Sequence, residues 1–250
     1  EFRNPEGWIN SCIKLFEGIP IQIKIHLSRL SISGTSGTLV PCRSNGVILG
    51  NSIPYNEACT SNSKKLNLIA GEDKFLNNPY SSLAKAINLI DTFGEDIFLR
   101  HQSDWISGWF LNDWSYGEEG NNIKLGWNIV NKSWPESFNT FSLIKSMPII
   151  KKSGSILGKI NQSIANLLGT SEKLLLISGT TDANAAFIAA QVKEDEGLTV
   201  LGTTIVLKKI IQKTFSHPGI TMHRVNNNWI CGGSSNAGCG VLSRFFSDLE

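Results

Sequence analysis

Two short apolar runs in the second half of the chain each end in a small polar turn. Residues 174–177 lead into Gly-Thr-Thr-Asp at 179–182, and residues 198–201 lead into Gly-Thr-Thr at 202–204. Apolar runs of this length, bounded by turn residues, are typical of buried strands. A strand that ends in such a turn and continues as an alanine-rich helix directs backbone N–H groups and short hydroxyls at one point, which suits a phosphate or a polar substrate. We therefore expect chemistry at these two turns.

Asp182 stands at the first of these turns, where the predicted strand passes into the predicted helix. It is the only carboxylate between Glu172 and Glu194. The local pattern favours a helix cap, because an aspartate at this position binds free N–H groups and the positive end of the helix dipole. A catalytic carboxylate is the alternative interpretation, and the local pattern leaves both open.

The first part of the chain predicts a helix, two strands and a glycine-rich turn between them. A helix begins after Asn4, and the alternation in residues 21–27 indicates a strand that continues through 30–33. The turn at residues 34–38 reads GTSGT, and residues 39–42 are extended again. An ordinary hairpin turn is the interpretation that the local pattern favours.

The alternative for GTSGT is a wall of a polyol pocket. In this interpretation the hydroxyls of Ser36 and Thr38 would bind a sugar. Further on, Gln102 and Asp104 precede or begin a short aromatic helix and are candidates to face a ligand, whereas His101 is expected to be structural. The adjacent Glu118 and Glu119 favour a solvated loop over acid/base chemistry.

The remaining pattern predicts elements that support these turns. They are a short surface helix within residues 60–79, a helix capped by Ser81 or Ser82 and ended by Gly94, a hairpin over 153–160, a helix over 161–168 ended by Gly169, and a strand over 205–212. Walker A, G-x-G-x-x-G and H-E-x-x-H sequences do not occur.

Composition and charge exclude several classes of function. The 250 residues are 41% hydrophobic and 18% charged, with a formal net charge of +2 and no basic block, so neither a nucleic acid nor an anionic membrane is expected as partner. Five cysteines without C-x-x-C spacing fit reduced thiols in the cytoplasm. No membrane-spanning run or signal-peptide pattern occurs. The sequence makes no prediction of the oligomeric state.

Taken in order, several segments resemble the FGGY carbohydrate kinases, especially the ribulose and xylulose kinase-like proteins of cyanobacteria and plants. The matching segments are SISGTSGT, IPYNEAC, HQSDWISGWF, NNIKLGWN, SGSILGKI, LISGTTDANAAF, VLGTTIVL and GGSSNAGCGVL. The most specific is LISGTTDANAAF, which is similar to the family's G-x-x-D-x-x-A-A segment. The resemblance covers nearly the whole chain.

The resemblance implies an α/β protein with the actin-like, ribonuclease H-like ATPase fold, in which two domains close on a cleft. Residues 1–192 would form the sugar-binding domain, and residues 193–250 would begin the ATP-binding domain. It implies ATP and Mg²⁺ as cofactors and a small sugar as substrate. By the same resemblance, Asp182 would be the catalytic base. The expected sugar-binding residues are Ser36, Gly37, Thr38, Asn56 and Asp104, and the expected phosphate-binding residues are Gly202, Thr203 and Thr204.

The chain also departs from the family pattern. Glu57 stands where the family has Asp, and Cys59 where it has Arg, and both differences bear on which sugar is preferred. The opening D-x-G-T-S-G turn and the distal adenine motif are not found, and the chain starts at Glu1 rather than Met. We therefore expect a fragment that, alone, binds ATP poorly and turns over little sugar.

Three hypotheses follow. The first is an ATP-dependent kinase of a ketopentose, D-ribulose before D-xylulose. The second is a non-catalytic sugar-binding or regulatory relative, which the presence of Asp182 disfavours. The third is another ATPase of the actin-like superfamily. The GTSGT turn and the tryptophan-rich residues 105–134 argue against it, because they suit a small polyol site better than a protein partner.

Overall fold

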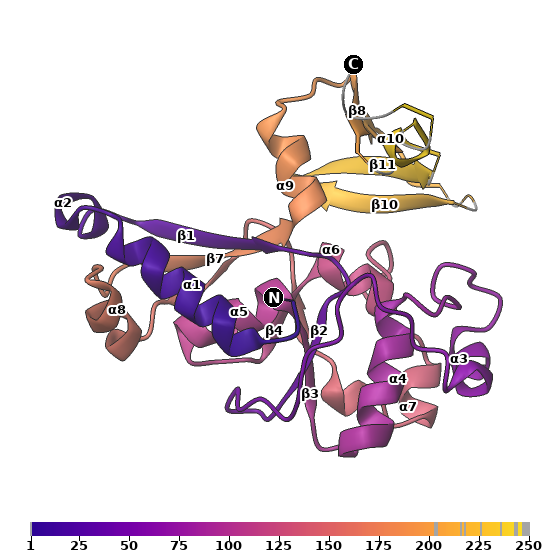
Figure 1. Cartoon of the computed structure of the whole chain (residues 1–250), viewed down its shortest axis with the longest axis horizontal. Helices are drawn as coiled ribbons and strands as arrows, with labels where there is room; N and C mark the ends of the chain where they lie inside the picture. The colour runs from indigo at the N-terminus through magenta and orange to yellow at the C-terminus, as the bar shows by residue number, and fades with distance from the viewer. Residues whose placement is uncertain are drawn as a thin grey trace. The chain divides into compact units, whose positions relative to one another are not determined.

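A computed structural model describes residues 2–202, 205–215, 217, 219–225, 227–235, 237–242 and 245–246. The chain forms two compact units, Glu1–Asp182 and Ala183–Glu250. Figure 1 shows the elements of each unit along the chain. We call them unit 1 and unit 2 and describe each by itself.

Unit 1 is a mixed α/β structure, and most of its strands pair with strands that lie far away in the sequence. A three-stranded sheet has the order β1-β7-β6, and two strand pairs, β2-β3 and β4-β5, complete the strands described in this unit. The strands are β1 (Arg29–Gly34), β2 (Leu39–Cys42), β3 (Phe98–His101), β4 (Tyr116–Glu118), β5 (Ile149–Lys151), β6 (Ile156–Lys159) and β7 (Leu175–Thr181). The helices are α1 (Pro5–Glu17), α2 (Ile21–Lys24), α3 (Ser63–Ala70), α4 (Ser82–Phe93), α5 (Gln102–Leu111), α6 (Glu119–Asn122), α7 (Ser137–Thr140) and α8 (Gln162–Leu168), with 3-10 turns at Ile123–Leu125 and Ile144–Ser146.

Local capping explains why the predicted helices form where they do. The Asn4 side chain accepts from the N–H groups of Glu6 and Gly7 at the start of α1, and Ser81 Oγ accepts from Ala84 N at 3.1 Å at the start of α4. Gly169 adopts φ 71° and ends α8 in the left-handed conformation that glycine tolerates. These boundaries confirm the predictions from sequence.

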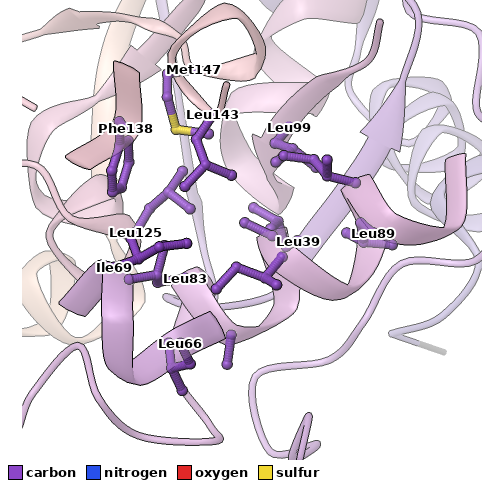
Figure 2. Packing of buried hydrophobic residues seen from close by; sticks show 14 of the residues in the cluster. Leu39, Leu66, Ile69, Leu83, Leu89, Leu99, Leu125, Phe138, Leu143 and Met147 are labelled. Carbon is purple, nitrogen blue, oxygen red and sulfur yellow. The ribbon is translucent and has the colours of Figure 1, made fainter. Parts of the chain in front are cut away.

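Two hydrophobic clusters hold unit 1 together. The first surrounds α4 and joins it to β2, β3 and the segment from Leu125 to Met147; Figure 2 shows Leu39, Leu83, Leu99, Phe138 and Leu143 from these elements packing against one another. The second surrounds α5. Its fully or nearly fully buried members are Phe16, Val40, Cys42, Trp105, Ile106, Phe110, Trp114, Ile160, Ala165, Leu168, Leu174 and Leu176.

Three strand predictions in unit 1 are wrong. Residues 21–24 form helix α2 because the N–H groups of Ile23 and Lys24 both donate to the Pro20 carbonyl, and their alternating isoleucines remain exposed. Neither expected hairpin forms. In place of the first hairpin, β1 pairs with β7 and β2 pairs with β3. In place of the second, β5 pairs with β4 and β6 pairs with β7. Most of these strands thus pair with distant segments, because strand stability depends on packing against partner strands more than on local sequence.

Unit 2 is an antiparallel sheet with one packed helix. The sheet has the order β10-β11-β9-β8 and contains β8 (Gly197–Leu201), β9 (Ile205–Ile211), β10 (Ile220–Val225) and β11 (Asn228–Ser235). α9 (Asp182–Ala189) begins at the last residue of unit 1, and its Phe187 packs with Ile210 and Ile230. A short helix, α10 (Cys239–Leu242), follows β11. The two units are divided between Asp182 and Ala183 because α9 packs against the sheet of unit 2. The assignment of residues 1–192 to a sugar-binding domain and of residues 193–250 to an ATP-binding domain stays a prediction.

Further sequence expectations concern the strand at residues 198–201 and the state of the cysteines. Residues 198–201 form β8 as predicted, but this strand is mostly exposed because it lies at the sheet edge and pairs with β9. All five cysteines are free thiols. Within the described part of the chain, no helix has both the length and the apolar character to cross a membrane.

Candidate functional site

The parallel pairing of β1 with β7 brings the GTSGT turn and Asp182 to one edge of the sheet. Gly34, the last residue of β1, is paired with Thr181, the last residue of β7. The chain therefore continues into Thr35 on one strand and Asp182 on its neighbour. The sequence predicted both turns, but only the fold shows the register between β1 and β7 that brings them together.

A β-bulge precedes this edge. Ser31 pairs with Ile177 and Ser33 with Thr180, so β7 has one more residue than β1 in this interval. At Gly179 the two backbones come so close that a Cβ atom would overlap the Ile32 carbonyl group. Bulges of this kind redirect the residues that follow them. The bulge thus determines how Thr180, Thr181 and Asp182 leave the sheet.

Hydrogen bonds within unit 1 fix the GTSGT turn. The Thr35 N–H and hydroxyl donate to Gln102 Oε1 at 3.1 and 3.0 Å. Thr38 Oγ1 lies 2.8 Å from Thr35 Oγ1 and accepts from the Tyr55 N–H at 3.2 Å, and the Thr38 side chain is fully buried. Both threonine hydroxyls and Gln102 therefore serve to hold the turn.

Ser36 and Gly37 form the outer part of the turn. Ser36 is half-buried, and among the described residues no group is hydrogen-bonded to its hydroxyl. Gly37 has φ 103°, and a Cβ here would meet Tyr55 Cβ at 3.5 Å and Lys124 Cδ at 3.6 Å. The backbone conformation is what requires glycine here, since these neighbours are at ordinary van der Waals distance. The role of Ser36 and Gly37 toward a sugar stays a prediction.

Two lysines lie beside this turn, and neither was predicted as a site residue. Lys124 Nζ donates to the Ser36 carbonyl at 3.3 Å, and Lys85 Nζ donates to the Gly37 carbonyl at 3.0 Å. Burial lowers the pKa of Lys124, while the negative charge of Asp182 acts to raise it. Lys124 could have been identified from sequence, because it lies within the NNIKLGWN segment that resembles the kinase family. Lys85 could have been identified because it is a lysine on a helix face of apolar residues, where lysine is unusual.

Asp182 is the exposed first residue of α9. It therefore lies in the first turn of the helix, where a carboxylate interacts favourably with the positive end of the helix dipole, and its negative charge acts on the Lys124 ammonium group. Its position is compatible with both interpretations of the sequence.

The other expected sugar contacts have different surroundings. Asn56 is exposed and follows Tyr55, whose N–H and carbonyl are tied to Thr38 and Lys85. Its neighbour Glu57 forms an ion pair with Arg3. Asp104 is buried, with its two carboxylate oxygens accepting from Glu118 N at 3.0 Å and Asn122 Nδ2 at 3.1 Å. The structure thus places Asp104 in an internal network, and its role toward a sugar stays a prediction.

The expected solvated loop at Glu118 and Glu119 is wrong, because both side chains are buried. Glu118 caps α6 by accepting from the N–H groups of Gly120 and Asn121, each at 2.8 Å. Burial raises the pKa of Glu118 to about 8; the two N–H groups act to lower it, and Asp104 and Glu119 to raise it. His101 is also structural, as expected, with Nε2 2.9 Å from Ser82 Oγ.

Raising the pH from 5 to 8 should lower the free energy of unfolding through Glu118. The folded state holds this proton up to about pH 8, whereas the ordinary value is 4.5, so the folded state binds more protons in this interval and loses stability as the pH rises. Urea midpoints of the wild type and Glu118→Gln at pH 5, 6, 7 and 8 should show a smaller slope in the variant. Exposed Glu136→Gln is the control; an unchanged slope in Glu118→Gln would contradict the assignment.

The phosphate-binding prediction falls in unit 2. Gly202 is exposed, follows β8, and its carbonyl accepts from Cys239 N at 2.9 Å. Thr203 and Thr204 lie outside the described residues. Leu201 is paired with Ile205 in the antiparallel pair of β8 and β9. The role of all three residues stays a prediction.

A buried lysine in unit 2 was also missed. Lys208 Nζ donates to Asn184 Oδ1 at 2.6 Å, and Asn184 Nδ2 lies 3.3 Å from His223 Nδ1. These contacts join the first turn of α9 to β9 and β10. These contacts could not be predicted from a local sequence pattern, because the three residues lie on three separate elements.

Comparison with solved structures defines the fold class. No protein-family model matches the chain. The xylulose kinase from Rhodospirillum rubrum is 14% identical over 98% of this chain and 55% of its own, with a TM-score of 0.85. The gluconate kinase from Lactobacillus acidophilus is 15% identical over 99% and 55%, with a TM-score of 0.80. The Plasmodium falciparum glycerol kinase with ADP is 18% identical over 98% and 56%, with a TM-score of 0.78.

The chain therefore has the α/β fold of carbohydrate kinases, the actin-like, ribonuclease H-like ATPase fold. It spans about half the length of the solved kinases that it matches. The expectation about the fold class is confirmed. At these identities the likeness concerns the fold, and the reaction has to be argued from the site.

Proposed function

We propose that the protein is an ATP-dependent kinase of a ketopentose, D-ribulose before D-xylulose, and that Asp182 is its general base. The observation that carries the proposal is the β1–β7 register, which places the GTSGT turn and Asp182 at the same end of two adjacent parallel strands. Ligands bind at the carboxyl ends of parallel strands in open α/β sheets. The solved kinases with this fold act on polyols and sugar-like compounds, which supports a substrate of that class.

In the proposed reaction Asp182 takes the proton from one sugar hydroxyl. The oxygen of that hydroxyl then attacks the γ-phosphorus of ATP, the bond from the γ-phosphorus to the bridging oxygen breaks, and ADP leaves with the electron pair. Such a transfer requires positioning, charge neutralisation and a carboxylate within hydrogen-bond reach of the acceptor, rather than a covalent enzyme intermediate. The charge of Asp182 acts on Lys124, and Lys124 binds the GTSGT turn, so this lysine connects the proposed base with the proposed sugar side.

The sugar side of the proposed site comprises Ser36, Gly37 and Asn56. The hydroxyl of Ser36 would bind a sugar hydroxyl, and the positive φ of Gly37 allows the turn to approach the ligand closely. Thr38 would contribute by holding the turn from inside. Glu57 stands where the resembled family has an aspartate, and it forms an ion pair with Arg3. This difference would affect which sugar is preferred.

ATP would be bound by Gly202, Thr203 and Thr204 through backbone N–H groups and hydroxyls. Mg²⁺ would neutralise the charge that develops on the phosphate oxygens. Among the described residues, no three His, Cys, Asp or Glu side chains are grouped to hold a metal ion. The described part of the chain therefore offers no protein ligand set, and the ion would enter on the phosphates.

The test is phosphoryl transfer by the protein at its natural length, with D-ribulose, D-xylulose, glycerol and gluconate as acceptors. We expect ATP-dependent turnover that is greatest with D-ribulose, measured by ADP release and by mass spectrometry of the sugar phosphate. Turnover of glycerol or gluconate alone would contradict the ketopentose assignment. Calorimetric binding of a sugar without any transfer would favour the non-catalytic alternative.

A further inference from the structure

Lys85 is a buried cation with an unusual set of partners. Its side chain, which extends from α4, is fully buried. Its Nζ donates to three carbonyl oxygens, those of Gly37 at 3.0 Å, Tyr55 at 3.2 Å and Tyr80 at 3.0 Å. An ammonium group has three N–H donors, so all of them are used. Among the residues that the structure describes, the hydrogen-bond partners of Lys85 Nζ are all neutral backbone carbonyls and none is a carboxylate.

The three carbonyl groups belong to three separate segments. Gly37 is in the GTSGT turn, Tyr55 precedes Asn56, and Tyr80 lies just before α4. The first two segments also meet through the bond from Tyr55 N to Thr38 Oγ1. Lys85 therefore ties together the two loops that carry the proposed sugar contacts, although it is itself closed off from solvent.

Two successive carbonyl groups of the turn are each held by a lysine. Lys124 binds the Ser36 carbonyl and Lys85 binds the Gly37 carbonyl. In a trans peptide the N–H group points away from the carbonyl oxygen. The N–H groups of Gly37 and Thr38 are consequently held on the side away from the lysines, and neither has a hydrogen-bond acceptor among the residues that the structure describes.

A buried lysine in this position is unfavourable for stability. Burial lowers the pKa of Lys85 to about 8; the charge of Lys124 acts in the same direction, and Cys59 and Glu57 act in the opposite one. Burial removes the hydration of the ammonium group, and the three carbonyl groups return hydrogen bonds but no opposite charge. The advantage of the ammonium group therefore lies in the geometry that it imposes.

We propose that Lys85 is a positioning residue for the sugar site, which orients the Gly37–Thr38 peptide and couples the GTSGT turn to the loop before Asn56. This inference rests on the proposed function. Lys85 does not touch the substrate. It acts through the turn, so its loss displaces the groups that bind the sugar and leaves the ATP side unchanged.

The test compares Lys85→Met with Lys65→Met in the protein at its natural length. Methionine keeps the length of the side chain and removes the charge. The matched control is Lys65, a partly exposed lysine of α3 whose Nζ lies 2.7 Å from Asp91 Oδ1 of α4. We expect the KM for D-ribulose to rise about tenfold or more in Lys85→Met, because small displacements of binding groups have effects of this order. The KM for ATP should stay within twofold, even though methionine leaves three buried carbonyl groups without this donor and so lowers the melting temperature.

The pH dependence provides a second readout that does not need a variant. Above about pH 8 the neutral amine has two N–H donors for three carbonyl groups, so the wild-type KM for D-ribulose should rise between pH 7 and pH 9.5 while the KM for ATP does not. Lys124→Met removes the neighbouring positive charge and should move this rise to higher pH.

The possible outcomes separate the two proposals. If the wild type is active and Lys85→Met keeps its KM for D-ribulose within twofold, the positioning role is wrong. A flat pH profile of the wild-type KM would overturn it as well, even if Lys85→Met fails to fold. If the wild type phosphorylates no sugar, the proposed function fails, and this inference fails with it.

Discussion

Replacing Asp182 with asparagine should lower kcat for sugar phosphorylation by about 10²- to 10⁴-fold, the usual contribution of a general base. Asparagine has nearly the same shape but cannot accept the proton of the attacking hydroxyl. The affinity for the sugar should stay within a few fold, because the GTSGT turn and Lys85 remain unchanged. Steady-state kinetics and calorimetry of Asp182→Asn, with exposed Asp195→Asn as the control, measure the two effects separately.

The same variant distinguishes catalysis from helix capping. Asparagine caps a helix about as well as aspartate does, so a residue that serves only as a cap would tolerate the change with little effect on stability or turnover. Wild-type kcat in Asp182→Asn would therefore overturn the base assignment. A large fall in kcat with an unchanged melting temperature would exclude the capping interpretation as the whole explanation.

Gly179→Ala should destabilise unit 1 by about 3 kcal/mol, the upper end of the usual range for overpacked interiors. A Cβ at this position would overlap the carbonyl oxygen of Ile32 and lie 2.7 Å from its carbonyl carbon. Both groups are backbone in adjacent strands, so no side-chain rotation can relieve the overlap. The strands must separate at the bulge, which also displaces Thr180, Thr181 and Asp182.

Urea unfolding followed by tryptophan fluorescence measures this loss, since every tryptophan other than Trp229 lies in unit 1. Gly7→Ala is the control. A Cβ at residue 7 would meet no atom closer than 3.7 Å, and alanine in a helix should increase stability by about 0.5–1 kcal/mol. An equal or higher urea midpoint for Gly179→Ala would show that the bulge is not constrained as described.

Elements governed by local interactions were predicted well from sequence. α1 and α4 begin at predicted caps, and α4 and α8 end at the predicted glycines, because an Asn or Ser at the start and a glycine at the end interact only with backbone within one turn. The β7–α9 junction at Asp182 was found for the same reason. Its catalytic interpretation, by contrast, came from the resemblance to the sugar kinases.

Elements governed by distant partners were predicted poorly. The alternation of isoleucines near Pro20 suits a strand, but no neighbouring strand pairs with it, and α2 forms instead. Glu118 carries the same local signal as a surface acid, yet the fold buries it against Asp104 and Asn121. Burial of a charge depends on what packs over it, which no local pattern contains.

The sequence by itself determined where the turns lie and which residues they offer, because turn and cap preferences are properties of a few consecutive residues. Only the tertiary structure decided that β1 pairs in parallel with β7, and that Lys85 and Lys124 hold successive carbonyl groups of the GTSGT turn. Strand pairing and the burial of a cation depend on groups far apart in the chain. The free energy of such contacts exists only once the chain has brought them together.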